Sequence, residues 1–494
     1  MRYISVPKEL RFSEIQGIDA CFAPGRYVRF IPPSTRSQND FAPLNRLIIL
    51  RESRIIPKKD NIYRYAEIGD IDVDTGGIVF RQIPGYRLPT NRPSAAKHGD
   101  VLVSTVRTYR KGIGCVSDDG DNLVTTNAVL NICGVTDFAP NLTLLYIYSF
   151  LRTDFFVEQV WSLLNRGLYP RMDKGALDKI LIPISPDKRV IRYVSALMQA
   201  IVEKEKNVRD KNQLIHSMIE AELAGEQKME GRFSYAFPAM SEISALGRLD
   251  ASMYTEAFKR KEFLLRNYAL GCGTYSQTGF DICRGQNLQV SCIGKSIYSD
   301  EMRPNFYRLL LPTHITDVGT VSEFEWLGNS RSLSLLLEGD IVFGGEATFR
   351  CVVACDALSC PTISNIHAIL LRSDSLPLHL KIFAGAWLRY LGEWGYVKAI
   401  AVGGQGGSIG TEYFDHLPIP KFPDEKQGEI ARLYHYDAPP PPGKPTLDTL
   451  VAWHKQWNKE LGIWELDREM KNLQRTLWDV QQKIINGKTV AVPL

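Results

Sequence analysis

The sequence predicts an α+β fold in which two mixed α/β domains are separated and followed by long helices that pair as an antiparallel coiled coil. Three observations lead to this fold class. Two stretches of the chain repeat in the same order, each repeat holds short β-branched runs between Gly and Asp turns, and two long segments carry heptad spacing. The length of 494 residues agrees, because at about 150 residues per domain it allows roughly three structural units.

Composition describes an ordinary globular protein. Hydrophobic residues make up 44% of the chain, charged residues 23% and aromatic residues 10%, which excludes a broadly disordered or fibrous chain. The apolar stretches fall short of the ~20 residues that cross a bilayer, and no secretory signal is visible, so we expect a cytoplasmic protein with reduced thiols at its nine cysteines. A net charge of +4 allows an anionic partner without identifying one.

The first domain is recognised through its repetition later in the chain. The run GDVLVSTVRTYRKGIGCV begins at Gly99, and GDIVFGGEATFRCVVACD begins 240 residues later at Gly339. At the same spacing, and without a gap, residues 108–110 (TYR) fall on residues 348–350 (TFR). The match therefore extends beyond one shared turn.

The ends of the two copies match as well. Residues 182–187 (IPISPD) correspond to residues 419–424 (IPKFPD), 237 residues further on, and Asp19-Ala20 near the start recurs as Asp250-Ala251. Two copies of this length do not form a solenoid or a propeller, which are built on periods of about 20 to 50 residues. The chain is predicted to hold two diverged copies of one domain, over residues 1–184 and 229–423.

A long helix is predicted between the two domains, over residues 185–228. No Gly or Pro interrupts the chain from Asp187 to Leu223, and at ~1.5 Å per residue such a helix reaches on the order of 55 Å, so we expect a spacer. β-branched residues recur every seven positions and form a coiled-coil seam: Val194, Ile201, Val208 and Ile215. The companion positions are half polar: Leu197, Lys204, Lys211 and Met218.

A second long helix is predicted over residues 446–487, after a short helix and a Pro-rich insert at 424–445 and before a tail at 488–494. Four successive prolines, Pro439 to Pro442, make the insert stiff and non-helical. The helix carries its own seam with alternating spacings of four and three: Leu466, Met470, Leu473, Leu477, Val480 and Ile484. Its first turns add Trp453, Trp457 and Trp464, either as core packing or as a docking surface for another subunit.

Motifs for catalysis or metal binding are not found. The run CIGKS at Cys292 lacks the first Gly of a phosphate-binding loop, and VGGQGGSIG lacks the third Gly of a dinucleotide loop. Three cysteines and a histidine (Cys351, Cys355, Cys360 and His367) lack the paired spacing of a zinc knuckle, so we interpret the cysteines as buried thiols. Neither a nuclease centre nor the Asn-Pro-Pro-Tyr tetrapeptide of adenine methylation is present. We expect no catalytic residue, no metal and no cofactor on this chain.

The duplicated pattern resembles the specificity (S) subunit of type I restriction-modification systems over nearly the whole chain. The resemblance is carried by the GDVLVSTVR and GDIVFGG strands, by the LIPI and LPIP ends followed by charged helix starts, and by the Asp-Ala openings. In that family each globule is a target recognition domain that reads half of a split DNA site. The paired helices hold the two domains apart and bind two methyltransferase subunits.

The resemblance also implies partners and cofactors. The chain would be a non-catalytic, DNA-binding subunit that assembles with double-stranded DNA, two methyltransferase (M) subunits and restriction/translocase (R) subunits. It would hold no cofactor itself, whereas the methyltransferase would bind S-adenosylmethionine and the restriction partner would bind ATP and Mg.

A DNA-reading domain needs cations for phosphates and planar or amide groups for base edges. In the first domain such residues follow a strand and fill the turn-like NRGLYPRMDK segment: Arg107, Tyr109, Arg110, Lys111, Asn165, Arg166, Tyr169 and Arg171. In the second domain they are Arg350, Lys398, Gln405 and Ser408. Taken singly, each Arg or Lys of this set is also consistent with an ordinary surface charge that contacts only solvent.

Two other functions remain open. A coiled-coil scaffold that presents two globules to other proteins would bind no specific DNA. A specificity subunit for a different DNA-modifying or defence effector would bind DNA without a methyltransferase. A self-contained modifying enzyme is disfavoured by the missing motifs, and it would bind S-adenosylmethionine.

Overall fold

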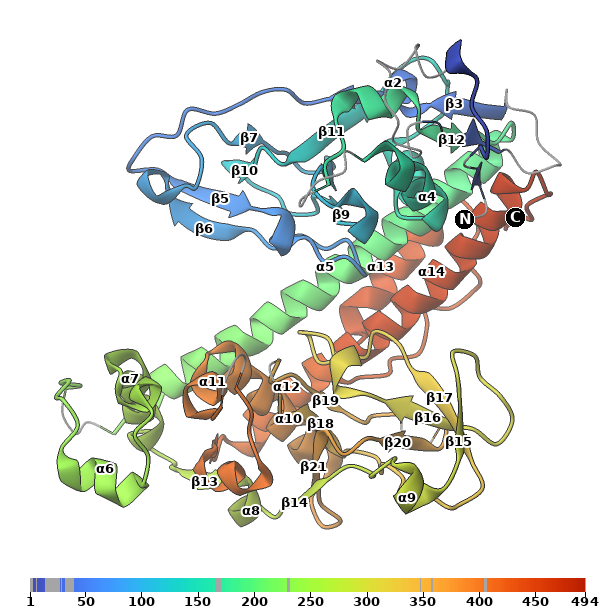
Figure 1. Cartoon of the computed structure of the whole chain (residues 1–494). Helices are drawn as coiled ribbons and strands as arrows, with labels where there is room; N and C mark the ends of the chain where they lie inside the picture. Colours follow the sequence, from blue (N-terminus) through green and yellow to red (C-terminus); the bar gives the residue numbers. More distant parts are fainter. Residues whose placement is uncertain are drawn as a thin grey trace. The chain divides into compact units, whose positions relative to one another are not determined.

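The computed structural model describes residues 3–5, 7–13, 27, 29–31, 40–164, 170–228, 232–346, 348–356, 359–403 and 407–493. The chain forms two compact units (Figure 1). Unit 1 comprises Met1–Asn207, Pro439–Lys459 and Arg468–Leu494, and unit 2 comprises Val208–Ala438 and Glu460–Asp467. Each unit contains one copy of the repeat together with parts of the long helices.

Unit 1 contains two four-stranded sheets. The first is antiparallel throughout, in the order β4 (Ile48–Leu50), β11 (Val129–Val135), β8 (Val101–Ser104) and β9 (Ile113–Cys115). The second has the order β6 (Arg81–Pro84), β5 (Ile62–Ala66), β10 (Leu123–Thr125) and β7 (Ser94–Ala95), with β5 and β10 parallel. The segment LVTTNAVLNI at residues 123–132 therefore divides between the two sheets, with β10 in one and β11 in the other.

Successive side chains of the central strand β8 lie alternately in two hydrophobic cores. Val101 and Val103 lie in a core with buried aromatic residues of α3 (Leu144–Leu151) and α4 (Asp154–Leu163), whereas Leu102 lies in a second core with Leu123 of the other sheet. This alternation is the two-residue period of a strand that is buried on both faces. The domain closes where β3 (Phe41–Pro43) pairs antiparallel with β12 (Leu181–Pro183).

Unit 2 repeats the antiparallel sheet and three strands of the second sheet, which confirms the duplication. Its antiparallel sheet has the order β14 (Asp281–Arg284), β21 (Ala368–Arg372), β18 (Ile341–Gly344) and β19 (Cys351–Val353). Its second sheet has the order β15 (Ser296–Ser299), β17 (Glu325–Asn329), β16 (Tyr307–Leu310) and β20 (Thr362–Ser364), with β16 and β20 parallel. The fourth strand of the second sheet lies at opposite edges in the two units, because among the described strands β7 has no counterpart in unit 2 and β15 has none in unit 1. The closing pair is β13 (Cys272–Thr274) with β22 (Pro418–Pro420), and the covering helices are α10 (Leu378–Glu393) and α11 (Tyr396–Ile400).

The repeated Gly-Asp pair has a structural role in both units. Both glycines have a left-handed backbone, with φ of 83° and 81°, which glycine adopts without strain. Asp100 and Asp340 are 2% and 1% exposed, and each accepts the backbone N–H of the residue three positions earlier. Arg51 contacts the first carboxylate at 2.8 Å, and Arg372 contacts the second at 2.5 Å. Buried carboxylates require such partners. In both units the Gly-Asp pair forms the turn that begins the central strand, which accounts for its repetition.

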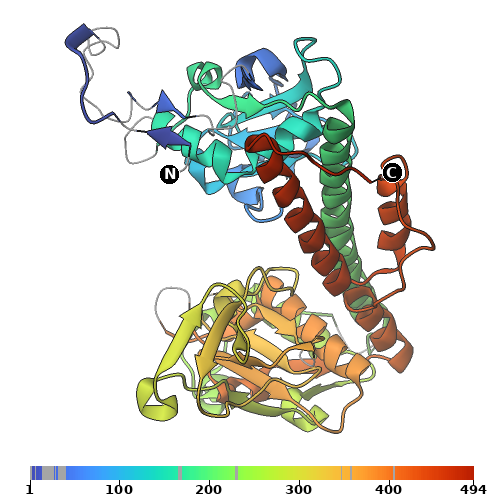
Figure 2. The ribbon, with the colours of Figure 1, turned by 90° about the vertical axis from the view of Figure 1, so that its right-hand side faces the viewer.

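The long helices pair antiparallel within unit 1 (Figure 2). The first is α5 (Lys188–Gly225), and the last is α14 (Ile463–Ile485). In unit 1, Met198 and Ile201 of α5 lie beside residues 474–481 of α14, and Lys204 lies near Glu469, so the two sequences run in opposite directions. The seam positions are all less than 10% exposed: Val194, Ile201, Val208, Ile215, Leu466, Met470, Leu473, Leu477, Val480 and Ile484.

The prediction of one helix over 446–487 is wrong. The segment forms α13 (Leu450–Glu460) and α14, with a break at Gly462. A Cβ on Gly462 would lie 2.5 Å from the Tyr436 backbone nitrogen, so this close approach requires glycine. Trp457 is 9% exposed and belongs to α13, whereas Trp464 is 8% exposed and belongs to α14. These tryptophans pack inside the protein rather than forming one exposed aromatic face.

A buried polar cluster lies where α5 meets α13 in unit 1. Lys204 is 0% exposed, its Nζ donates to Asn458 Oδ1 at 2.6 Å, and the ammonium lies 5.3 Å from the Trp457 ring centroid. Burial, opposed by the nearby charge of Glu469, lowers the pKa of Lys204 to about 8. Burial and the Lys204 charge lower the pKa of His454 to about 4, so this histidine is neutral at pH 7.

The remaining short elements complete the two units. They are β1 (Ile4–Ser5), β2 (Arg29–Phe30), α2 (Leu44–Leu47), α6 (Met240–Leu246), α7 (Glu256–Arg266), α8 (Tyr275–Thr278), α9 (Val290–Ile293) and α12 (Asp424–Tyr434). In the described part of the chain, no helix is long and apolar enough to cross a membrane, and no three metal-binding side chains gather. Cys351 and Cys355 are buried free thiols, and Cys360 is half-buried.

Candidate nucleic-acid interface

The turn after β8 carries the first group of predicted DNA contacts. It is a single 3₁₀ turn, Thr108–Arg110, flanked by Arg107 and Lys111 in left-handed conformation, with φ of 50° and 59°. Non-glycine residues rarely adopt this conformation, and surrounding contacts must hold them there. The buried Thr108 does so, because its Oγ1 donates to the Ser104 carbonyl at 2.7 Å. The turn presents Arg110 to solvent.

A second segment lies against this turn and brings Arg171 to it. Arg171 forms an antiparallel bridge with Val106, and the backbone N–H of Met172 donates to the Thr105 carbonyl at 2.8 Å. The Arg171 side chain is exposed beside the basic turn. The structure therefore brings Arg107, Arg110, Lys111 and Arg171 together, although 60 residues separate the two segments. Three other predicted contacts lie outside the described residues: Asn165, Arg166 and Tyr169.

An aromatic pair supports the basic turn. The Tyr109 ring makes an edge-on contact with Trp161 of α4, with centroids 4.6 Å apart and an interplanar angle of 81°. Trp161 is 50% exposed, and sequence reasoning missed it. Lys111 Nζ contacts Asp154 Oδ1 of the same helix at 2.7 Å, so part of its charge is neutralised.

Unit 2 builds the same surface from different residues. Glu346 bridges Ser408 as Val106 bridges Arg171, and the Ile409 N–H donates to the Gly345 carbonyl at 2.8 Å. Ser408 and Lys398 are exposed. By their spacing of ten residues they correspond to Arg171 and Trp161 of unit 1. Gln405 lies outside the described residues. Equivalent backbone positions in the two units therefore hold side chains of different charge and size.

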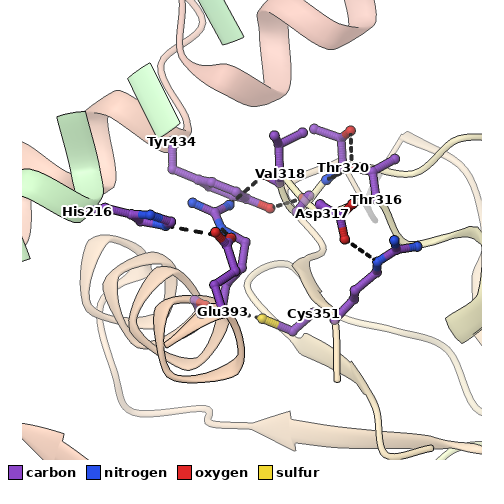
Figure 3. Close-up of polar contacts among 12 residues, drawn as sticks. His216, Thr316, Asp317, Val318, Thr320, Cys351, Glu393 and Tyr434 are labelled. Atoms are coloured by element: carbon purple, nitrogen blue, oxygen red, sulfur yellow. Dashed lines mark hydrogen bonds and ion pairs between the residues drawn. The ribbon is translucent and has the colours of Figure 1, made fainter. Parts of the chain in front are cut away.

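Arg350, the fourth predicted contact of unit 2, is engaged within the protein (Figure 3). Its Nε lies 2.5 Å from Asp317 Oδ1, and its Nη1 donates to a backbone carbonyl at 3.2 Å. Asp317 stands on a turn held by a hydroxyl contact of 2.9 Å between Thr316 and Thr320, and by Arg389, which donates to the Val318 carbonyl at 2.5 Å. Arg350 therefore has fewer free donors for DNA than the exposed Arg110.

Each unit also has a shallow groove where its two sheets meet, and these grooves were missed by sequence reasoning. In unit 2 the groove lies between the residues after β14 and those before β21. Its polar side chains are Asn287, Gln289, Tyr298, Glu325, Asn365 and His367, over a floor that includes Leu309 and Leu311.

A groove lies at the corresponding position in unit 1, but different side chains line it. It lies between the residues after β4 and those before β11, and it contains Arg54, Ser94, Asn127 and Lys174. Arg54 is exposed, and Ser94 Oγ donates to Asn127 Oδ1 at 3.2 Å. The signal that could have located both grooves is an asparagine shortly before the last strand of each antiparallel sheet, in TTNAVL and in SNIHAIL.

Comparisons with known proteins give similarity to solved structures only. No protein-family model and no curated protein matches the chain. The crystal structure of the HsdS subunit from Thermoanaerobacter tengcongensis is 20% identical, with 91% of this chain and 97% of that chain covered and a TM-score of 0.31. The type I restriction-modification S subunit from M. genitalium is 11% identical, with 92% and 99% covered and a TM-score of 0.41.

A third similar chain comes from a study of complex assembly and conformational transition of the type I R-M system. It is 18% identical, with 93% of this chain and all of that chain covered and a TM-score of 0.31. Identities and scores of this size do not establish a family.

Proposed function

We propose that the chain is the DNA sequence-specificity subunit of a type I restriction-modification system. Each unit would read one half of a bipartite DNA target, and the long helices would bind methyltransferase subunits. Its role would be recognition, and the catalysis would belong to its partners.

The observation that carries this proposal is the duplicated surface built by the turn after β8 and after β18. In both units this turn bridges a segment that lies shortly before the closing strand, at Val106–Arg171 and Glu346–Ser408. A protein that reads two blocks of sequence needs two similar frameworks with different side chains. The duplicated bridges provide the frameworks, and the exchange of Arg171 for Ser408 provides the difference.

The exposed cations of unit 1 support contact with a polyanion. Arg110 and Arg171 are exposed, and they lie beside an exposed tryptophan. Phosphate contacts of this kind position a protein on DNA, while base edges supply the specificity. The helices α5 and α14 would serve as spacer and as binding surface for the two M subunits. S-adenosylmethionine would then be bound by the methyltransferase, and ATP and Mg by the R subunits.

The decisive experiment is to express the chain with an associated methyltransferase subunit in a host without background adenine methylation and to map modified bases by long-read sequencing. A split motif of two short blocks around an unspecified spacer is expected. If the complex assembles and adds no methylation, the proposal fails in this form. The coiled-coil scaffold and the specificity subunit of another effector then gain weight.

Salt dependence gives a second test. If phosphates dominate affinity, log K falls with log salt by ~0.9 per neutralised phosphate. Arg110→Ala should lower that slope by about one unit, whereas Arg350→Ala should change it less because its guanidinium is engaged by Asp317. Binding that does not depend on salt, or equal effects of the two variants, would contradict this assignment.

A further inference from the structure

The groove of unit 2 contains two amide side chains that are held in the same way. Asn287 Oδ1 accepts the backbone N–H of Gln289 at 3.0 Å, and Asn365 Oδ1 accepts the backbone N–H of His367 at 3.2 Å. Each contact ties an amide oxygen to the residue two positions later, which fixes the orientation of the side chain. Among the described residues, neither Nδ2 group has a hydrogen-bond partner, so both donors are available.

The two amides are brought together by a close backbone approach. The segments after β14 and before β21 form a parallel bridge at Gln286 and Asn365. A Cβ on Gly285 would lie 2.1 Å from the Asn365 carbonyl oxygen, so glycine is required for this approach. Asn287 and Asn365 are therefore placed by main-chain contacts and do not depend on flexible side chains.

Exposed apolar side chains lie beside the amides. Tyr298 and Ile366 line the groove and are 54% and 41% exposed, and Ile297 next to Tyr298 is 61% exposed. Exposed apolar side chains next to preoriented polar groups are typical of a binding surface. Cations stand close by, because Arg331 is exposed and donates to the Cys292 carbonyl of α9 at 2.9 Å, and Lys295 is exposed just before β15. These cations would hold a polyanion from beside the groove, because the groove itself is lined by the carboxylate of Glu325 and by neither cation.

We propose that this groove is the base-reading site of unit 2 and that it selects an A·T base pair in the DNA major groove. An asparagine or glutamine amide matches adenine, which presents the N7 acceptor and the N6 amino donor there. An apolar side chain matches the thymine methyl group, which G·C pairs lack. Asn287 or Asn365 would donate through Nδ2 to adenine N7 and accept the adenine N6 amino group through the second lone pair of Oδ1, which guanine cannot supply. Ile366 would contact the thymine methyl. This inference rests on the proposed function, and it adds the residues and the base pair.

The test uses variants that keep the side-chain oxygen bonded to the backbone N–H and remove the Nδ2 amino group. Asn365→Asp and Asn287→Asp each retain an oxygen for the backbone N–H but lack the amino group. Asn305→Asp is the matched control, because Asn305 is an exposed asparagine of unit 2 that does not line the groove. Each variant is expressed with the methyltransferase subunit, and the methylated motif is mapped by long-read sequencing.

We expect one of the two groove variants, or both, to relax or change A·T positions in one block of the motif only. Affinity for the original target should fall on the order of 10- to 100-fold. The control should keep the wild-type motif. An unchanged motif in both groove variants, or an equal loss at both blocks, would overturn the inference. If the wild-type complex yields no split motif, the proposed function itself fails, so the two failures are distinguishable.

An atomic probe completes the test. Duplexes with the mapped target receive 7-deazaadenine at one position at a time, which removes the N7 acceptor and leaves the pairing intact. The wild-type complex should bind at least one such duplex more weakly, and the variant that lacks the donor should not distinguish it from adenine. If the wild type tolerates 7-deazaadenine throughout the block read by unit 2, an amide contact to N7 is refuted.

Discussion

Replacing the buried lysine of α5 should change the pH dependence of stability. The ordinary lysine pKa is 10.5, and burial lowers that of Lys204 to about 8. At 1.36 kcal/mol per pKa unit, the buried positive charge costs about 3 kcal/mol at neutral pH. The folded protein binds fewer protons than the unfolded chain between about pH 8 and 10.5, so this cost is relieved as the pH rises through that range.

The variant Lys204→Met removes the charge and keeps most of the side-chain volume. It also leaves Asn458 Oδ1 without its donor at 2.6 Å and removes the contact with the Trp457 ring, which together cost about 2 kcal/mol. We expect the variant to be about 1 kcal/mol more stable than the wild type at pH 7. At pH 10.5 we expect it to be about 1 kcal/mol less stable, because the neutral lysine keeps its hydrogen bond to Asn458 but has lost the cation contact with the Trp457 ring. The sign of the difference should therefore reverse with pH.

Thermal unfolding followed by circular dichroism at several pH values measures this reversal. At about 2–4 °C per kcal/mol, the difference in melting temperature between the two proteins should change by about 4–8 °C over the range. Lys206→Met is the matched control, because Lys206 lies on the same helix and its Nζ contacts Asp119 at 3.3 Å near the surface. Parallel pH profiles for the wild type and Lys204→Met would refute the reasoning.

Three further outcomes are expected. Gly462→Ala should destabilise the protein by about 1–3 kcal/mol through overpacking, whereas Gly428→Ala, with open space around its Cβ, should stabilise α12 by up to about 1 kcal/mol; urea unfolding compares the two signs. Burial opposes protonation of His435, but the contact with Glu465 at 2.5 Å outweighs it and raises the pKa of His435. The resulting stability is present below about pH 6.5 and is lost as the pH rises through the folded pKa, so the advantage of the wild type over Glu465→Gln should shrink in unfolding experiments above that point. Arg350→Ala should lower the urea midpoint of unit 2 by removing an ion pair, and an unchanged midpoint would show that this pair contributes nothing.

The duplicated fold could be predicted because its signals are local and repeated. The Gly-Asp pairs at 99–100 and 339–340 reappear with their strands, since a left-handed turn and a buried carboxylate tolerate little change. The uninterrupted heptads of α5 likewise predict a single helix, which the structure confirms over Lys188–Gly225.

The break between α13 and α14 could not be derived from spacing alone. The heptad pattern from Leu466 onward is compatible with a longer helix, and Gly462 ends it only because the chain at Tyr436 approaches so closely. That contact joins segments that are far apart in the sequence, and no local pattern records it.

The candidate site was predicted in part. The basic turn at 107–111 was visible because its residues are adjacent in the sequence. The grooves were not visible, because residues such as Asn287, Tyr298 and Asn365 come from separate strands and each is unremarkable by itself. Exposure of Arg110 and engagement of Arg350 likewise depend on neighbours that the sequence does not identify.

The closing strand pairs give each globule adjoining points of entry and exit. The chain enters the main part of the first globule along β3 and leaves it along β12, and these two strands are hydrogen-bonded to each other. β13 and β22 do the same in the second globule. A segment whose ends lie side by side can be exchanged as a cassette, because the helices outside it meet the same two strands whatever lies between them. Exchange of the residues between β3 and β12, or between β13 and β22, should therefore replace the surface of one globule and leave the long helices unchanged.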